Sequence, residues 1–418
     1  MSNLKKNTSI YLFSNVINAA IPFLLMPVLT RYLSVDEYGK VALFQSLLLA
    51  LGSVIGFNAV GAVVRKNYDQ GITLSEIKEY RTNSIYVLIF SIIIIYIISN
   101  ISMPMVVTYL SMSSYWVYSG IIISSFSFFV SILLSHFQVE HKANKYGFLQ
   151  ISRSLLNMLL TLFFVIVFMK GAQGRVDALL FSSFVFFIIA VFFIIKENLI
   201  GITLLNWEYI KDIFKYGVPL IPHTIGLFLI TSVDRFLIND KLGLRDAGLY
   251  MVAVQISLAM VVIFDAINKA YMPWLFEKLK KDKAEEKIKI VKNTYIYFFS
   301  ILLCCTLSFF IGPFIINIIA GSKYSDSASL IGWLCLGQGF GGMYLIITSY
   351  IFYAKKTYYL SVITIFTGFL NVIFIIFFID YFGLVGAAIA FSLSKFIQFL
   401  LTWILSMKVI KMPWLYYE

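Results

Sequence analysis

The apolar residues of this chain gather into twelve long stretches that short polar segments separate. A hydrocarbon core about 30 Å thick needs roughly 20 apolar residues for one helical crossing, and each stretch approaches or exceeds that length. The pattern therefore predicts twelve transmembrane helices. Their approximate ranges are 9–30, 40–64, 83–103, 115–138, 148–169, 176–195, 217–238, 248–272, 294–319, 328–352, 359–379 and 383–407.

The basic residues between these stretches alternate in density from one gap to the next. With a cytoplasmic N-terminus, the inner segments hold 23 Lys and Arg residues, with Lys5, Lys6 and Arg153 among them, and the outer segments hold 8. Short loops with an excess of Lys and Arg stay on the cytoplasmic side of a membrane. Both termini are therefore expected inside.

Composition agrees with an all-α polytopic membrane protein, since 60% of the residues are hydrophobic and 13% are charged. The net charge of +12 would suggest nucleic acid as the partner of a soluble protein. Here the basic residues lie in short loops, where they set orientation and meet anionic lipid. We expect membrane lipids as partners and no nucleic acid.

Neither metal nor cofactor is expected. Three cysteines at membrane depth behave most simply as small apolar residues, with a redox or metal role as the alternative. The three histidines show no ligand spacing. Since no gap exceeds about 22 residues, a soluble catalytic domain has no room, and we expect no enzyme activity and no catalytic residues.

The chain also divides near its midpoint. Residues 196–216 combine apolar and charged positions at near-helical spacing, which predicts an amphipathic helix on the cytoplasmic membrane face. We expect a six-helix bundle over 1–195, this linker over 196–216, and a second six-helix bundle over 217–418. Because six is even, the two bundles have the same orientation, as in transporters built from parallel repeats.

Weak internal similarity supports a duplication, although the residues involved are common ones. At a shift of 209 residues, one set of three positions recurs in the loops after spans one and seven. At a shift of 212, another set of four recurs at the starts of spans six and twelve. The matched sets are Leu33, Glu37 and Gly39 with Leu242, Asp246 and Gly248, and Gly171, Gly174, Ala178 and Ser182 with Gly383, Gly386, Ala390 and Ser394.

Proline pairs occur in spans one and seven, at Pro22 and Pro27 and at Pro219 and Pro222. Interior proline removes a backbone hydrogen bond and kinks a helix. Proline is also frequent in membrane helices generally, so single prolines carry little information. A pair in each of two corresponding spans indicates hinges in helices that line a cavity.

Two lysines lie inside predicted spans, where a basic side chain costs about 2.5–3.5 kcal/mol near the bilayer centre. Lys269 follows Asp265 by four residues, so the two share a helix face. They form either a structural ion pair or a pair that faces a cavity. Lys395 lies near the middle of span twelve, too deep for its side chain to reach water easily. It is the stronger candidate for a cation in the lumen.

Other polar groups at membrane depth are less decisive. Asp234, Arg235 and Arg31 end their spans and serve equally well as anchors or as ligands. Uncharged groups follow at Asn15, Asn18, Asn58, Asn157, Asn268 and Asn371. Some of these amides are explained by hydrogen bonds between neighbouring helices alone. A mostly cationic set of buried charges suits an anionic passenger such as a phosphate compound.

Several segments resemble bacterial polysaccharide-biosynthesis membrane proteins, over essentially the whole length. They are RYLSVDEYG at 31–39, KYGVPLIPHTIGLFLITSVDRFLI at 215–238, GLRDAGLY at 243–250, GSKYSDSASLI at 321–331 and YFGLVGAAIAFSLS at 381–394. Each motif alone is weakly specific for this family, but the occurrence of all of them in this order is more specific. The resemblance identifies the chain as a member of the MOP flippase superfamily, close to the Wzx type.

This resemblance implies a MATE-like fold in the bacterial inner membrane. It also implies alternating-access transfer of a polyprenyl-diphosphate-linked oligosaccharide from the cytoplasmic to the outer leaflet, for O-antigen or capsular polysaccharide assembly. The polymerase and chain-length machinery are further candidate partners. Spans one, two, seven and eight would line the cavity. The candidate substrate contacts are Lys269, Lys395, Asp265, Arg65, Arg81 and Asn18.

One departure limits what the resemblance transfers. Related peptidoglycan lipid flippases carry arginines in span one, where this chain has Asn15 and Asn18, so no arginine cluster is assigned. A cation-coupled drug exporter of the same superfamily is one alternative, and a membrane-embedded polymerase or glycosyltransferase is another. His223, beside Pro222, is either a proton-coupling group or an interfacial packing residue.

Overall fold

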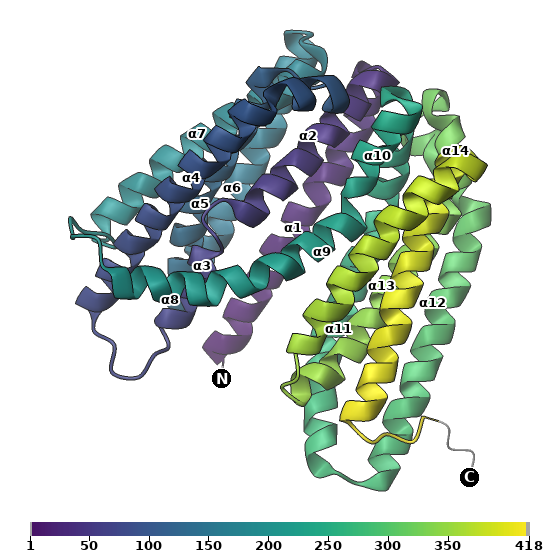
Figure 1. The fold of residues 1–418 in the computed structure, drawn as a ribbon. Coiled ribbons are helices and arrows are strands. Elements are labelled where there is room, and N and C mark those ends of the chain that lie inside the picture. Colours follow the sequence, from purple (N-terminus) through teal and green to yellow (C-terminus); the bar gives the residue numbers. More distant parts are fainter. Residues whose placement is uncertain (1, 415–418) are drawn as a thin grey trace. The chain divides into compact units, whose positions relative to one another are not determined.

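The computed structural model describes the backbone of residues 2–414 and the side chains of residues 10, 11, 13–109 and 111–414, and these residues form helices without strands (Figure 1). Lys5 and Lys6 lie outside the described side chains. The α-helices are α1 Ser2–Tyr32, α2 Val35–Val54, α3 Ala59–Lys66, α4 Leu74–Leu110, α5 Ser114–Val139, α6 Ala143–Leu162, α7 Gly171–Lys196, α8 Trp207–Gly217, α9 Ile221–Thr231, α10 Val233–Leu242, α11 Leu244–Lys281, α12 Ala284–Ile319, α13 Ala328–Tyr353 and α14 Tyr358–Val409. A π-helical turn, Phe163–Val167, follows α6, and 3₁₀ turns at Val218–Leu220 and Ser322–Ser327 precede α9 and α13.

Ten helices of the described residues are long and apolar enough to cross a membrane, and the bent pair α2 and α3 makes an eleventh. The pair bends by 47° where a single span over 40–64 was expected. Gly56, Phe57 and Asn58 all have positive φ at this point, which interrupts the helix. The chain is therefore a multi-pass, all-helical membrane protein with a break in its second expected span.

The element α14 contains both of the last two expected spans. It has 52 residues, about 78 Å of helix, which is far longer than one crossing of about 30 Å. Gly383 interrupts it with φ of 55°, and a Cβ on Gly386 would lie 2.1 Å from the Phe378 carbonyl oxygen. Such an approach over eight residues requires the chain to reverse. The helix is thus a hairpin whose arms run antiparallel (Figure 1).

The same reversal occurs 212 residues earlier, between the π-helical turn and α7. Gly171 has φ of 56°, and a Cβ on Gly174 would lie 3.0 Å from the Phe164 carbonyl. Only glycine adopts positive φ and tolerates such a close backbone approach without cost. The glycines that recur in the sequence therefore occupy equivalent backbone positions, which supports a duplication.

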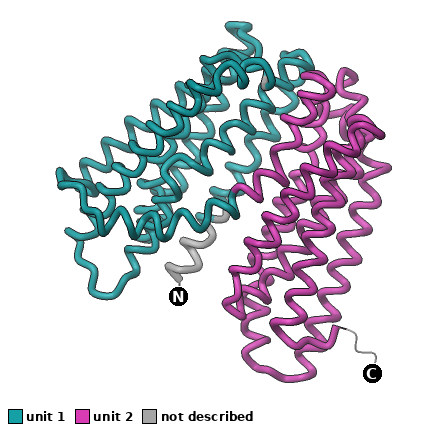
Figure 2. The backbone as a smooth tube through the Cα atoms, viewed as in Figure 1, with its two compact units in different colours: residues 1–224 teal, residues 225–418 magenta. Residues whose placement is uncertain are grey.

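The chain forms two compact units, residues 1–224 and 225–418 (Figure 2). Helix α8 falls in the first unit, where Asp212 accepts hydrogen bonds from Arg65 at 2.8 Å and from the Tyr80 hydroxyl at 2.7 Å. Its buried Ile210 and Ile213 face the unit. The amphipathic helix expected after residue 196 is thus present, and the division at residues 195 and 216 stays a prediction.

In the second unit, α9 lies directly against the first arm of α14. A Cβ on Gly226 would lie 2.9 Å from the backbone nitrogen of Ile365, and one on Gly368 would lie 2.9 Å from the Gly226 carbonyl. Membrane helices pack through dispersion and hydrogen bonds rather than through the hydrophobic effect, so small residues let their backbones approach. Asn371 adds a hydrogen bond to the Leu229 carbonyl at 2.8 Å.

Candidate functional site

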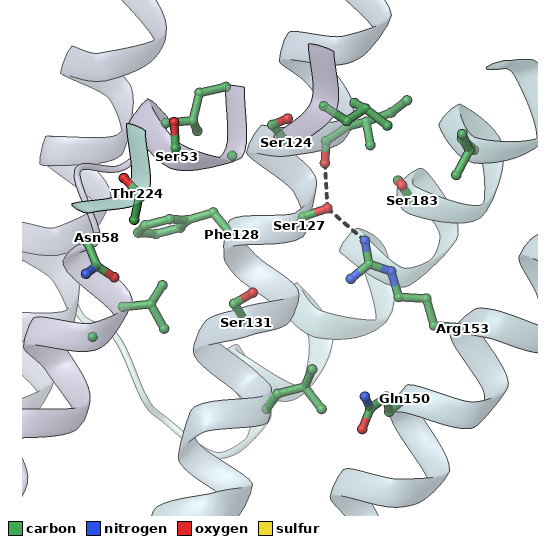
Figure 3. Close-up of a pocket in the computed structure, with 18 of the residues that line it drawn as sticks. Ser53, Asn58, Ser124, Ser127, Phe128, Ser131, Gln150, Arg153, Ser183 and Thr224 are labelled. Atoms are coloured by element: carbon green, nitrogen blue, oxygen red, sulfur yellow. Dashed lines mark hydrogen bonds between the residues drawn. The ribbon is translucent and has the colours of Figure 1, made fainter. Parts of the chain in front are cut away.

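A polar cavity of about 720 Å³ lies inside the first unit (Figure 3). Its wall combines α1, the broken pair α2 and α3, α5, α6 and α7, and residues as far as Thr224. Twelve uncharged polar side chains and one charged side chain, that of Arg153, line it. Among the described residues, no carboxylate lines this cavity. The site therefore combines many neutral hydrogen-bonding groups with one positive charge.

Arg153 lies ten residues after the start of α6, about 15 Å along the helix. Helix α6 forms most of the candidate membrane span Ala143–Val167, so Arg153 lies well inside that span. The assignment of Arg153 to the cytoplasmic side stays a prediction. Helix α6 begins at Ala143, five residues before the expected apolar stretch 148–169, which already contains Arg153.

The guanidinium of Arg153 reaches across the cavity from α6 to α5 (Figure 3). It donates a hydrogen bond of 2.7 Å from Nη2 to the Ser127 hydroxyl, which itself donates to the Ile123 carbonyl at 2.7 Å. Arg153 forms no ion pair with a carboxylate of any described residue. Neutral groups and the occupant of the cavity must therefore stabilise the charge of Arg153, which favours an anionic occupant.

Two amides are oriented as additional donors. Arg175 donates hydrogen bonds to Asn157 Oδ1 at 2.9 Å and to the Thr161 hydroxyl at 2.5 Å. The Ser154 hydroxyl donates to Asn18 Oδ1. With both amide oxygens engaged as acceptors, the amide nitrogens of Asn18 and Asn157 remain to donate. The lining of the cavity is therefore biased towards acceptor ligands such as phosphate oxygens and sugar oxygens.

Of the sequence-predicted contacts, Asn18 lines this cavity. Lys269 forms an ion pair with Asp265 at 2.5 Å on α11, and both side chains are 47% exposed. This geometry confirms that the two residues share a helix face. It leaves open both of the roles proposed for them, and they stay candidates.

Lys395 lies within the second arm of α14 and is partly buried. Its ammonium group lies 3.4 Å from Gln398 Oε1 and 5.9 Å from the centre of the Phe391 ring. Neither contact neutralises the charge, although a cation over an aromatic ring is stabilised by the ring quadrupole. Lys395 also stays a candidate.

The two arginines proposed at the cytoplasmic rim are engaged with neighbouring residues. Arg65 pairs with Asp212, and Arg81 is buried and donates to Asn67 Oδ1 at 3.2 Å. Both contacts organise the helices of the first unit. A role in gathering substrate stays a prediction.

The proposed hinges occupy different kinds of helix. Pro22 and Pro27 lie within the continuous helix α1. Pro219 lies in the 3₁₀ turn before α9, and Pro222 lies in the first turn of α9. The second pair thus coincides with an interruption of α-helical structure and the first pair does not. Hinge motion itself stays a prediction for all four.

An ionic cluster lies at the C-terminal end of α7. Glu197 accepts hydrogen bonds from Lys145 at 2.8 Å and Lys142 at 3.2 Å and lies 2.9 Å from His136 Nε2. Partial burial alone raises the pKa of this carboxyl, but the three hydrogen bonds outweigh burial and hold the pKa at about 2. The cluster ties α5 and the start of α6 to the end of α7.

The sequence of α6 carries a further signal for the cavity. Gln150 is followed by Arg153 and Ser154 three and four residues later, then by Asn157 and Thr161, which places all five on one face of a helix. A polar stripe in a membrane helix indicates a protein-lined or water-lined surface. Helical spacing alone therefore distinguishes Arg153 from the basic residues of the cytoplasmic loops, which hydropathy does not.

Comparison with known proteins agrees with the fold and composition. The model of the polysaccharide biosynthesis protein family matches residues 4–279, more than half of the chain. The capsular polysaccharide biosynthesis protein CapF of Staphylococcus aureus is 24% identical over 413 residues, which cover 94% of this chain and 96% of that protein.

Two solved structures share the fold across both units. The lipid II flippase MurJ, in an inward closed conformation, has a TM-score of 0.75 at 16% identity and covers 96% of this chain and 87% of its own. An inward-facing multidrug resistance MATE family transporter of the MOP superfamily has a TM-score of 0.69 at 18% identity and covers 95% and 94%. Together with the family match, they lead to one conclusion: the chain is a multi-pass membrane protein that belongs to the polysaccharide biosynthesis protein family.

Proposed function

We propose that this protein is a flippase that moves a polyprenyl-diphosphate-linked oligosaccharide from the cytoplasmic to the outer leaflet of the bacterial inner membrane, for capsule or O-antigen assembly. The observation that carries the proposal is the position of Arg153. It belongs to the candidate membrane span Ala143–Val167, and among the described residues no carboxylate lines the cavity that it enters. A guanidinium binds phosphate oxygens in a bidentate way, and a low dielectric strengthens that attraction.

The rest of the cavity suits the remainder of such a head group. Its hydroxyl and amide side chains match the alternating donors and acceptors of sugars, and about 720 Å³ lies within the range of ligand sites. The polyprenyl chain stays in the hydrocarbon core of the membrane throughout, so the transfer costs no free energy for moving that chain between apolar and polar surroundings. The family and the name of the S. aureus relative support a polysaccharide precursor as the cargo.

The proposal includes the topology that the basic residues predict. Dividing α14 at Gly383 and joining α2 to α3 gives twelve crossings, with both termini in the cytoplasm. The protein acts by alternating access and not as an enzyme. The polymerase and chain-length machinery act on its product in the outer leaflet.

The polarity of the cavity weighs against a cation-coupled drug exporter. Cationic drugs are bound by carboxylates, whereas the charged side chain that lines this cavity is that of Arg153. We therefore retain the flippase as the function that the site supports best.

The test uses a bacterial strain whose surface polysaccharide depends on this protein. Depletion should leave the polyprenyl-diphosphate oligosaccharide in the cytoplasmic leaflet, as measured by the accessibility of the sugar to a membrane-impermeant lectin on spheroplasts. Arg153→Ala should lower the rate of appearance outside by about tenfold to a hundredfold, because charged hydrogen bonds contribute roughly 1.5–3 kcal/mol.

The matched control is Arg245→Ala, because Arg245 is 65% exposed and contacts Asp326 at 3.6 Å. This variant should behave as the wild type, and Arg153→Lys should retain an intermediate rate. Accumulation of unpolymerised units in the outer leaflet after depletion would overturn the proposal, since that outcome is the one expected of a polymerase.

A further inference from the structure

A second cavity, of about 200 Å³, lies wholly within the second unit. It is lined by Ile267, Tyr271, Trp274, Asn293, Thr294, Tyr297 and Ile346. These residues come from α11, α12 and α13. The volume is below the range of about 300–1,000 Å³ that is typical of drug-sized ligands. The cavity therefore has room for a single small ring.

The lining of this cavity is aromatic and hydroxylated but carries no charge. The rings of Tyr271 and Trp274 lie 5.4 Å apart between centroids, inclined at 43°. The Tyr271 hydroxyl lies 3.2 Å from the Thr294 hydroxyl and 3.3 Å from the Tyr350 hydroxyl. An ionic ligand would find no counter-charge on these walls, so the chemistry favours a neutral ligand.

One polar atom of the lining has no partner. The hydroxyl of Tyr297 is buried and makes no hydrogen bond to any described residue. Buried hydroxyls are almost always paired, because an unpaired one costs about 1–3 kcal/mol. No described residue supplies the partner that such a buried hydroxyl needs.

The charged pair of α11 points away from this cavity. Successive residues of an α-helix are about 100° apart, so Tyr271 and Trp274 lie close to the direction of Ile267, whereas Lys269 lies about 200° from it. Asp265 falls near Lys269 on that side, as their ion pair requires. The helix thus carries one charged face and one aromatic face.

The cavity lies near the end of two helices that exceed the bilayer. Helix α11 has 38 residues, about 57 Å, against a hydrocarbon core of about 30 Å. Its last turn carries Lys278, Lys280 and Lys281, which mark the membrane surface. Trp274 precedes this turn, and Thr294 lies ten residues into α12. The cavity therefore lies towards the lysine-rich end of α11.

We propose that this cavity is a binding subsite for one neutral sugar ring. The C–H face of a pyranose packs against the negative faces of Tyr271 and Trp274, while ring hydroxyls bond to Tyr297, Thr294 and the Asn293 amide. The identification of the sugar as part of a lipid-linked head group rests on the proposed function. The subsite selects the sugar as the head group approaches, and the positive charge of Arg153 is not part of it.

The test is saturation-transfer-difference NMR on the full-length protein in nanodiscs, with a panel of neutral methyl glycosides: glucoside, galactoside, rhamnoside and N-acetylglucosaminide. At least one should give a saturable signal. Trp274→Ala should weaken its affinity by about tenfold. Tyr297→Phe, which keeps the ring, should weaken it by about threefold to tenfold.

Two controls separate this subsite from the cavity of the first unit and from the surface. Tyr358→Phe removes the hydroxyl of a tyrosine that is 74% exposed, and it should leave the affinity unchanged. Arg153→Ala should also leave the glycoside signal unchanged while it impairs translocation. Loss of the glycoside signal in Trp274→Ala, together with an unchanged sidedness of the lipid-linked oligosaccharide when the protein is depleted, would sustain the subsite and overturn the flippase.

Three outcomes would overturn the subsite. They are no binding by any glycoside of the panel, equal affinity in the wild type and in both Trp274→Ala and Tyr297→Phe, and displacement of the glycoside by decane-length alkyl chains. The last of these would show that the cavity takes lipid.

Discussion

Arg153 and Ser127 form a hydrogen bond of 2.7 Å that joins α6 to α5 inside the cavity of the first unit. The Ser127 hydroxyl donates in turn to a backbone carbonyl of its own helix, so it accepts from the guanidinium in a fixed direction. The contact holds the plane of the guanidinium in place without neutralising it. An arginine that is positioned but uncompensated is suited to bind an anion that comes and goes.

Replacing Ser127 by Ala should therefore loosen this arginine without removing its charge. We expect a fall in translocation of about threefold to tenfold, because one hydrogen bond contributes roughly 0.5–1.5 kcal/mol. Transport of the labelled lipid in proteoliposomes, at matched protein content, measures the effect. Ser329→Ala, at an exposed hydroxyl of the second unit, is the control. A wild-type rate in Ser127→Ala would show that the contact does not position Arg153.

Lys269 and Lys395 provide an independent test of whether cations inside the spans serve the cargo. If they meet the diphosphate, Lys269→Ala and Lys395→Ala should each reduce the display of surface polysaccharide, and the corresponding Arg variants should restore part of it. Loss of Lys269 also leaves Asp265 without its partner at 2.5 Å. Full display by both Ala variants at normal abundance would refute the role of these lysines and leave only Arg153.

The sequence predicted the helical class and most span positions because apolar length has a direct physical meaning in a bilayer. It also predicted the equivalence of Gly171 and Gly383, which both adopt positive φ. It did not predict the break at Asn58, because nothing local demands positive φ there. A polar side chain that faces a cavity resembles one in a loop when only local hydropathy is considered, so hydropathy did not identify Arg153 as a residue of the cavity.

The cavity itself depends on tertiary structure. Asn18, Ser127 and Arg153 come from three helices, and only the packing of the first unit brings them together. The amide of Asn157 is oriented by Arg175, eighteen residues away on another helix. Such partnerships leave no trace in spacing along one helix. The polar stripe of α6 identifies one wall of the site, and the sequence is silent on the others.

The stability of the first unit should depend on pH through Glu197. Its pKa of about 2 lies below the usual value of 4.5, so its stabilising contribution is complete above pH 4.5 and is lost as the pH falls from there towards 2. The contribution is about 1–3 kcal/mol, since the carboxylate side chain is 18% exposed while Lys142 and Lys145 are more exposed.

Glu197→Gln should therefore lower Tm at pH 6, and the difference from the wild type should shrink at pH 3. Thermal unfolding in detergent at the two pH values measures this difference. Asp326→Asn is the control, because its ion pair with Arg245 at 3.6 Å is 65% exposed on both sides and should change Tm little at either pH. An equal difference at pH 3 and pH 6 would show that Glu197 is not held in its charged form by the cluster.

The approach of α9 to α14 should be intolerant of any side chain at Gly226. A methyl group there would lie 2.9 Å from the Ile365 nitrogen, a backbone atom that moves only with its whole helix. Gly226→Ala should therefore lower the Tm of the purified protein. Gly341→Ala is the matched control, because no atom lies within 4 Å of its Cβ position in α13 and a helical alanine is favoured over glycine by about 0.5–1 kcal/mol. Tm should fall in the first variant and stay level or rise in the second. Equal responses of the two variants would mean that α9 and α14 do not pack through these backbones in the membrane.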